Sequence, residues 1–255
     1  MVCAAAAALA SCGGGRTTAR PVAARASCRP PYAVRTATVP LTRAGRSIPT
    51  SAWYPRAPRG CRFPVVLFSH GAGGSPQDYS SLLGAWARDG FVVVGPKHPD
   101  RRTPPRAERA GRPADVLYVL DHLTAIAGRA GSGLAGEIDA RHIAVAGHSF
   151  GGFTAADVAA ADPRITALIV MAGGADPETA RRIHVPVLAL SGSHDRLIPT
   201  SIVRAFVAAL PRATPRRLVV LPGAGHLVYT NACVASHTCG RVQALTSSFL
   251  RRNAP

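Results

Sequence analysis

Lysine is nearly absent from this sequence, acidic residues are few, and no apolar run approaches the roughly 18 residues that a membrane-spanning helix needs. Lys97 is the single lysine among 30 lysines and arginines. The chain has only 13 aspartates and glutamates, so its formal net charge is +17. The arginines are spread along the chain rather than gathered in one segment. This pattern does not predict a nucleic-acid-binding face, and we expect no nucleic-acid partner.

The N-terminal segment lacks the basic residues that usually open an export signal, because no lysine or arginine precedes Arg16. Its alanine-rich run still resembles the end of a bacterial lipoprotein signal, with Cys12 at the cleavage and lipidation position. We expect a signal peptide over 1–11, a flexible tether over 12–30 and an exported protein, with membrane attachment through a lipid on Cys12. An upstream start, an ordinary signal or a chance alanine run are the alternatives.

Cysteine is also scarce, and no Cys-x-x-Cys pair or histidine pair at ligand spacing predicts a metal site. Without Cys3 and Cys12, an even number remains for disulfides in an oxidising compartment: Cys28, Cys61, Cys233 and Cys239. Proximity along the chain favours a Cys233–Cys239 bridge, which leaves Cys28 for Cys61. Buried free thiols are the alternative. We expect no metal and no organic cofactor.

The remaining sequence, 31–255, is long and apolar enough for one globular domain, since 47% of the whole chain is hydrophobic. An opening pair of strands is predicted at Val34–Leu41 and Ser47–Tyr54. Continuous apolar runs predict six buried parallel strands at Pro64–Ser69, Phe91–Pro96, His142–Gly147, Ala167–Ala172, Pro186–Ser191 and Arg216–Leu221. Amphipathic stretches alternate with them at Tyr79–Arg88, Pro113–Ala127, Gly152–Ala160, Ser201–Leu210 and Arg241–Arg252. This alternation predicts an α/β fold with about eight mostly parallel strands and helices on both faces.

A glycine-flanked serine joins one predicted strand directly to the next helix, in the stretch GHSFG from Gly147 to Gly151. A side chain on such a tight turn is held outside the carboxyl end of the sheet, where ligands of open α/β sheets bind. Ser149 is therefore the candidate nucleophile. The alternative, a capping serine at a glycine-rich helix start, does not require glycine on both sides.

A serine nucleophile needs a base, and the base needs a partner that fixes its tautomer. Asp195 and His226 each follow a later predicted strand, at the same edge of the sheet as Ser149. They are the candidate acid and base. Asp176 is the rival acid, and His148 is expected to point away from the nucleophile.

Two backbone amides are predicted to stabilise the oxyanion of an attacked carbonyl: that of Phe150, just after the nucleophile, and that of Ala72, in the loop His70–Gly74. His98 follows a strand at the same edge and is a candidate substrate-binding residue, with an exposed loop histidine as the alternative. The segment Asp100–Pro113 is expected to form a small lid or a mobile loop, with Pro113 in a first helical turn.

With GHSFGG and the stretch from Leu67 to Asp100, the chain resembles the α/β-hydrolase superfamily, in particular platelet-activating factor acetylhydrolase and dienelactone hydrolase-like esterases and, more distantly, cutinase-like polyester hydrolases. The resemblance implies an ester hydrolase acting on small-molecule or polymeric esters. Dienelactone hydrolases proper use a cysteine nucleophile, whereas this chain has Ser149, so no single substrate is carried over.

The predicted activity is serine esterase chemistry by a monomer, through an acyl-enzyme. The same residues could serve an amidase or peptidase, or a perhydrolase. A catalytically silent surface-binding protein on the same fold is the alternative from another class.

Overall fold

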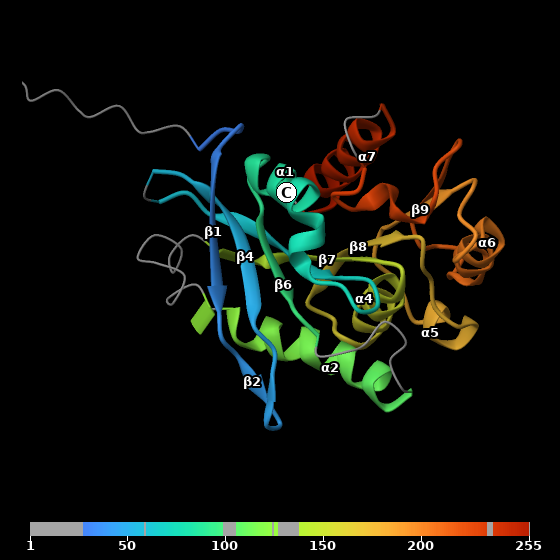
Figure 1. Cartoon of the computed structure of the whole chain (residues 1–255), viewed down its shortest axis with the longest axis horizontal. Coiled ribbons are helices and arrows are strands. Elements are labelled where there is room, and N and C mark those ends of the chain that lie inside the picture. The colour runs from blue at the N-terminus through green and yellow to red at the C-terminus, as the bar shows by residue number, and fades with distance from the viewer. Residues whose placement is uncertain are drawn as a thin grey trace, which may run out of the picture.

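A computed structural model describes residues 28–58, 60–98, 106–123, 125–126, 138–233 and 237–254. Its main sheet has eight strands: β1 (Ala33–Val39), β4 (Thr50–Arg56), β5 (Phe63–Ser69), β6 (Val92–Pro96), β7 (Ile138–His148), β8 (Ile165–Met171), β9 (Val187–Gly192) and β10 (Arg216–Leu221). They lie in the order β1-β4-β6-β5-β7-β8-β9-β10 (Figure 1). All neighbouring strands from β6 through β5 to β10 pair in parallel, and β4 is antiparallel to both of its neighbours, β1 and β6. The predicted α/β-hydrolase fold is confirmed.

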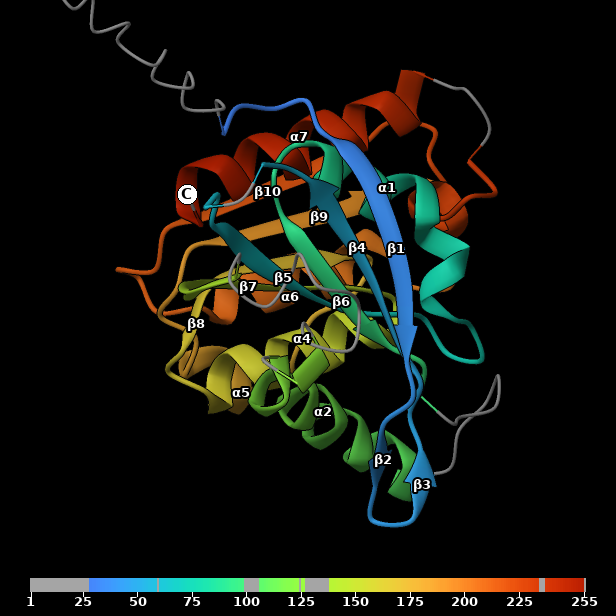
Figure 2. The same cartoon turned by 90° about the vertical axis from the view of Figure 1, so that its left-hand side faces the viewer.

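Helices cover both faces of the sheet. On one face lie α1 (Ser80–Arg88) and α7 (His237–Asn253), and on the other lie α2 (Arg106–Asp121), α4 (Phe150–Ala161), α5 (Pro177–Arg181) and α6 (Thr200–Ala209) (Figure 2). Each face has its own apolar core. The Trp86 indole N–H in α1 donates to the Thr246 hydroxyl in α7 over 2.9 Å, which joins the two helices of the first face. In the described residues, no helix combines the length and apolarity required to cross a membrane.

Strands β5 and β9 are buried along their whole length, as their continuous apolar sequences predict. Every residue of β5 and of β9 is buried. Parallel strands covered on both faces need apolar side chains in both directions, so no polar alternation is seen. The carboxyl ends of β5, β7, β9 and β10 therefore meet at one edge of a rigid sheet, where the loops that follow them lie close together.

The opening strands differ from the prediction. A small hairpin of β2 (Thr42–Arg43) and β3 (Arg46–Ser47) separates β1 from β4, so the second main-sheet strand begins at Thr50 rather than Ser47. The hairpin turn uses left-handed backbone at Ala44, with φ of 49°, and at Gly45, with φ of 73°. The sequence prediction missed this turn because Ala44, its first central residue, is not one of the residues that usually adopt left-handed backbone in such a turn, asparagine, aspartate or glycine.

Helix α2 also begins earlier than predicted. Pro113 lies inside the helix, which starts at Arg106, so the placement of Pro113 in a first turn was wrong. The missing N–H of a proline removes one helical hydrogen bond but does not forbid helix when packing holds the segment. The described part of the segment expected to form a lid or loop is consequently helix, and residues 99–105 lie outside the described residues.

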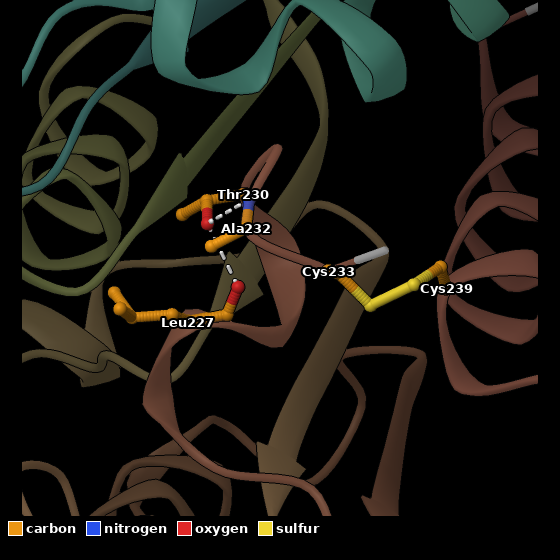
Figure 3. The surroundings of a disulfide bond; sticks show 5 residues. All are labelled: Leu227, Thr230, Ala232, Cys233 and Cys239. Atoms are coloured by element: carbon orange, nitrogen blue, oxygen red, sulfur yellow. Dashed lines mark hydrogen bonds between the residues drawn. A yellow bond between two sulfur atoms is a disulfide. The ribbon is translucent and has the colours of Figure 1, made fainter. Parts of the chain in front are cut away.

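Two disulfides are present, between the pairs that sequence proximity favoured. Cys28 is bonded to Cys61 with a Cα–Cα distance of 5.6 Å, and Cys233 to Cys239 with a distance of 6.0 Å. The second joins the loop before α7 to the first turn of that helix (Figure 3). The expected signal peptide over 1–11, the lipidation site Cys12 and residues 13–27 of the tether lie outside the described residues.

Candidate active site

Ser149 lies on a strained turn between strand and helix. Strand β7 ends at His148 and helix α4 begins at Phe150, so Ser149 alone makes the connection. Its backbone has φ of 54° and ψ of −124°, a region that residues other than glycine rarely adopt. The Ser149 N–H donates to the carbonyl of Met171 over 2.9 Å, which anchors the turn to β8. The strain is maintained by the surrounding structure and holds the side chain at the sheet edge.

The flanking glycines are required because the backbone segments around Ser149 nearly touch. A Cβ atom on Gly147 would lie 2.0 Å from the carbonyl oxygen of Gly151. A Cβ atom on Gly151 would lie 2.0 Å from the carbonyl oxygen of Ser69, at the end of β5. Both neighbours are backbone atoms, which cannot rotate away as a side chain can. The chain therefore turns within so few residues because only glycine fits on either side of the serine.

The three candidate residues on the loops after β7, β9 and β10 form a continuous hydrogen-bonded chain. Ser149 Oγ lies 2.9 Å from His226 Nε2, and His226 Nδ1 lies 2.8 Å from Asp195 Oδ2. Because an ionised carboxylate only accepts, Nδ1 carries the proton and Nε2 is left to accept the Ser149 hydroxyl proton. The Asp195 side chain is fully buried, whereas that of His226 keeps 11% of its surface exposed.

Asp195 is held by its own loop. Its Oδ1 accepts hydrogen bonds from the backbone N–H groups of Leu197 and Ile198, each over 2.9 Å. Oδ2 remains for His226. The rival acid Asp176 is used elsewhere: it caps α5 by accepting from the N–H groups of Glu178 and Thr179. Its hydrogen bonds therefore serve a helix start rather than a histidine.

The loop His70–Gly74 passes beside the nucleophile. A Cβ atom on Gly71 would lie 3.6 Å from Ser149 Cβ. The Gly71 N–H donates to the Tyr79 hydroxyl over 3.0 Å, and the Gly74 N–H donates back to the Gly71 carbonyl over 3.2 Å. Within the described part of the chain, the Ala72 N–H makes no hydrogen bond. An N–H in this position can donate a hydrogen bond to a ligand oxygen.

The buried side chain of His148 connects the segments of the site through hydrogen bonds. The Tyr79 hydroxyl accepts from Gly71 and therefore donates to His148 Nδ1, over 2.8 Å. His148 Nε2 then carries the proton and donates to the carbonyl of His226 over 3.0 Å. Burial and the neighbouring His226 lower the pKa of His148 to about 3, which keeps the ring neutral. The role of Tyr79 was not predicted from sequence, because its contact with His148 spans 69 positions of the chain.

The side chain of His98, the candidate substrate-binding residue, is not the exposed loop histidine of the alternative. Its side chain is buried and makes hydrogen bonds with Ser69 Oγ over 3.1 Å and with Asp115 over 3.3 Å. Its backbone N–H donates to His70 Nε2 over 3.0 Å. The position of a residue after a strand predicts where its backbone lies but not which way its side chain points. His98 therefore supports the loop after β5, and its part in substrate binding remains a prediction.

The rim of the site carries exposed apolar side chains. Leu197 has 71% of its surface exposed and Leu227 has 57%, and they follow Asp195 and His226 closely in sequence. The carbonyl of Leu227 accepts from the Thr230 hydroxyl over 2.8 Å, close to the Cys233–Cys239 disulfide (Figure 3). Large apolar side chains exposed beside a polar site are typical of contact with an apolar ligand. In the described ranges, no group of three or more histidine, cysteine, aspartate or glutamate side chains is arranged so that it could hold a metal ion.

Comparison with known proteins gives one match over nearly the whole chain. A protein-family model described as PET hydrolase-like matches residues 12–252. Two uncharacterized proteins of Mycobacterium tuberculosis, MT2364 of strain CDC 1551 / Oshkosh and Rv2307c of strain H37Rv, are each 41% identical over 49 residues. That match covers 19% of this chain and 17% of each relative, so it carries no information on the remainder of either protein.

Proposed function

The chain belongs to the PET hydrolase-like family, and from this membership we propose that it cleaves carboxylic esters with Ser149 as the nucleophile. Members of the family are serine carboxylic ester hydrolases. In the proposed reaction His226 is the general base and Asp195 orients it. The observation that carries the proposal is the continuous hydrogen-bonded chain from Asp195 through His226 to Ser149 Oγ, with heavy-atom distances of 2.8 and 2.9 Å.

Acylation begins when Ser149 Oγ attacks the ester carbonyl carbon. Nε2 of His226 takes the hydroxyl proton, and the buried Asp195 carboxylate stabilises the imidazolium that forms. As the tetrahedral intermediate collapses, the ester C–O bond breaks and the proton passes from Nε2 to the leaving alcohol. Water then attacks the acyl-enzyme with the same base, and the acid product leaves Ser149 regenerated.

The oxyanion of each tetrahedral intermediate is held by two backbone amides in this proposal. The N–H of Phe150 lies at the first turn of α4, where the helix dipole favours negative charge. The N–H of Ala72 comes from the loop beside Ser149 and makes no hydrogen bond within the described part of the chain. Removing one such donor typically lowers kcat by about 10²–10³-fold.

The substrate proposed from the rim is an ester with apolar groups on both sides of the scissile bond. Leu197 and Leu227 offer exposed apolar surface beside the candidate acid and base. Burying such surface against a ligand contributes about 25 cal/mol per Å². This favours apolar polyester chains or short apolar esters over charged ones.

The disulfides and the family point to a protein that works outside the cytoplasm. We further propose a signal peptide over 1–11, lipid attachment at Cys12, a tether to residue 30 and a single catalytic domain over 31–255 that acts as a monomer. Mass analysis of the protein exported by its native host measures the mature N-terminus and any lipid on Cys12. An unprocessed N-terminus would contradict the export signal.

Labelling with a fluorophosphonate, followed by peptide mass mapping, tests the catalytic assignment without assuming a substrate. We expect the probe on Ser149, with the reaction abolished in Ser149→Ala and in His226→Ala. His184→Ala is the matched control, because His184 is exposed and lies before β9, away from the proposed site. It should label as the wild type does.

Turnover of matched esters and amides then defines the reaction. We expect p-nitrophenyl ester hydrolysis, lowered about 10⁶-fold in Ser149→Ala. Faster amide turnover would identify a peptidase or amidase, and peroxide-dependent halogenation would identify a perhydrolase. Folded wild-type protein that neither labels nor turns over esters would contradict the proposal and favour a silent binding protein.

A further inference from the structure

A buried arginine from a distant helix holds the loop that carries Ala72. Arg112 lies in α2 and exposes only 1% of its surface. One guanidinium nitrogen, Nη1, donates to the carbonyl of His70 over 2.6 Å, and the other, Nη2, donates to the carbonyl of Gly71 over 3.2 Å. A planar guanidinium can grip two successive carbonyls in this way, whereas a lysine offers a single point charge.

These two contacts fix the direction of the Ala72 N–H. The Gly71 carbonyl and the Ala72 N–H belong to one planar trans peptide group, so they point in opposite directions. A donor that fixes the Gly71 oxygen therefore also fixes the direction of the Ala72 N–H. The preceding peptide group, between His70 and Gly71, is held by both of its polar groups. The His70 carbonyl accepts from Arg112, and the Gly71 N–H donates to the Tyr79 hydroxyl. The Ala72 N–H is left on the side of this loop away from Arg112.

A neutral histidine adds to the same carbonyl. His70 Nε2 accepts from the His98 N–H, so the ring proton is on Nδ1, which donates to the Gly71 carbonyl over 2.7 Å. Burial, His98 and Arg112 hold the pKa of His70 well below its usual range, so this tautomer persists. Charged and neutral donors on one carbonyl polarise the peptide and strengthen its N–H as a donor.

Arg112 also contacts the residue that carries the other proposed donor. Its guanidinium carbon lies 4.5 Å from the centre of the Phe150 ring, at the first turn of α4. One turn along α2, Asp115 accepts from Arg43, Arg46 and His98 and so anchors the helix to the β2–β3 hairpin. A single side chain from a fixed helix thus touches both segments of the candidate oxyanion hole.

We propose that Arg112 is a positioning residue that sets the oxyanion hole by orienting the Gly71–Ala72 peptide. The proposal rests on the esterase function proposed above. Arg112 does not touch the substrate, so its effect reaches the reaction through the Ala72 amide. The Ala72 N–H binds the oxyanion of the transition state more strongly than the carbonyl oxygen of the bound substrate. Misplacing this N–H should therefore lower kcat and leave KM little changed.

Arg112→Lys and Arg112→Met test this role. The matched control is Arg216→Lys, because Arg216 also donates to backbone carbonyls, those of Val207 and Leu210, in a different part of the fold. The measurements are kcat and KM for a p-nitrophenyl ester, with kcat expressed per active site titrated by fluorophosphonate. The inhibition constant of a trifluoromethyl ketone of matched acyl chain is measured alongside, because its adduct places an oxyanion in the hole.

For Arg112→Met we expect kcat per active site to fall about 10–10²-fold, less than for complete loss of a donor, with KM little changed. The ketone should bind more weakly by the same factor. Arg112→Lys should recover part of the loss, and Arg216→Lys should match the wild type. If the Met variant does not fold, the Lys variant gives the test through the same three measurements.

Unchanged kcat per active site in a folded Arg112 variant, with fewer titratable sites or lower thermal stability, would reduce Arg112 to a structural residue and overturn the proposal. A rise in KM with unchanged kcat would overturn it as well. Wild-type protein that neither labels nor hydrolyses esters would overturn the esterase function and this role together. An active wild type with unaffected Arg112 variants would overturn only the role of Arg112.

Discussion

Gly147→Ala adds one methyl group to the turn at Ser149, at a position with no room for it. The new Cβ would lie 2.0 Å from the Gly151 carbonyl oxygen, 2.3 Å from its carbonyl carbon and 2.8 Å from the Gly152 nitrogen. Real Cβ contacts under 3.0 Å are essentially never found. All three neighbours are backbone atoms of α4, so the helix start must move away from β7.

The cost should exceed that of ordinary overpacking. An extra methylene in a well-packed core typically costs about 1–3 kcal/mol because side chains can adjust. Here the first turn of α4 must shift against a buried strand, so we expect a loss of at least about 3 kcal/mol in the free energy of unfolding. The same shift would displace the Phe150 amide and would move Ser149 Oγ away from His226 Nε2.

Gly84→Ala is the matched control, because Gly84 lies in the middle of α1 and an added Cβ would meet nothing within 4 Å. Alanine is favoured over glycine inside a helix by about 0.5–1 kcal/mol, so this variant should be more stable than the wild type. Urea denaturation followed by circular dichroism measures both changes, and fluorophosphonate labelling measures the site. A Gly147→Ala protein as stable and as reactive as the wild type would refute the argument from backbone contact.

Three further predictions concern single polar side chains. Asp195→Asn should lower kcat about 10³–10⁴-fold by disturbing the His226 tautomer. Asp176→Ala should cost about 1 kcal/mol of stability through loss of the α5 cap and leave kcat unchanged; the reverse pattern in ester kinetics and urea denaturation would make Asp176 the acid. Between a pH of about 6.5 and 3, the unfolded chain binds a proton at His148 that the folded protein does not bind, so His148 contributes a fall of about 1.4 kcal/mol per pH unit to the free energy of unfolding on acidification, and His70, whose pKa is also lowered, adds to the same trend. His148→Gln should flatten this dependence in urea titrations at about pH 6.5 and pH 5, and equal slopes would contradict the assignment.

The sheet was predictable from sequence because its signals are local. A continuous apolar run such as that of β5 indicates a buried element, and the alternation of runs and amphipathic stretches predicts mostly parallel strands with helices on both faces. The same logic places Ser149, Asp195 and His226 at one sheet edge, since each follows a parallel strand. Their mutual distances depend on the conformation of the loops after β7, β9 and β10, and their catalytic roles remain predictions.

The support beneath the site was not predictable, because it is made across long separations. Arg112 meets its carbonyl partners 41 and 42 positions away, and an arginine in an amphipathic helix gives no local sign of burial. The partners of His98 were not predictable for a related reason: its backbone follows a strand as expected, but its side chain is held by hydrogen bonds with Ser69 and Asp115. Side-chain direction after a strand depends on tertiary partners that no period or motif encodes.

The distribution of polar and apolar groups separates the proposed chemistry from the choice of substrate. Arg112, Tyr79 and His148 are buried, and their hydrogen bonds end on backbone groups of the loops around Ser149. Such networks tolerate little change, because removing one partner leaves a buried polar group unsatisfied at about 1–3 kcal/mol. Leu197 and Leu227 have no such constraint, since most of their surface faces solvent. Substitutions at this rim should therefore alter which esters are accepted while leaving the fold and the reaction with Ser149 intact.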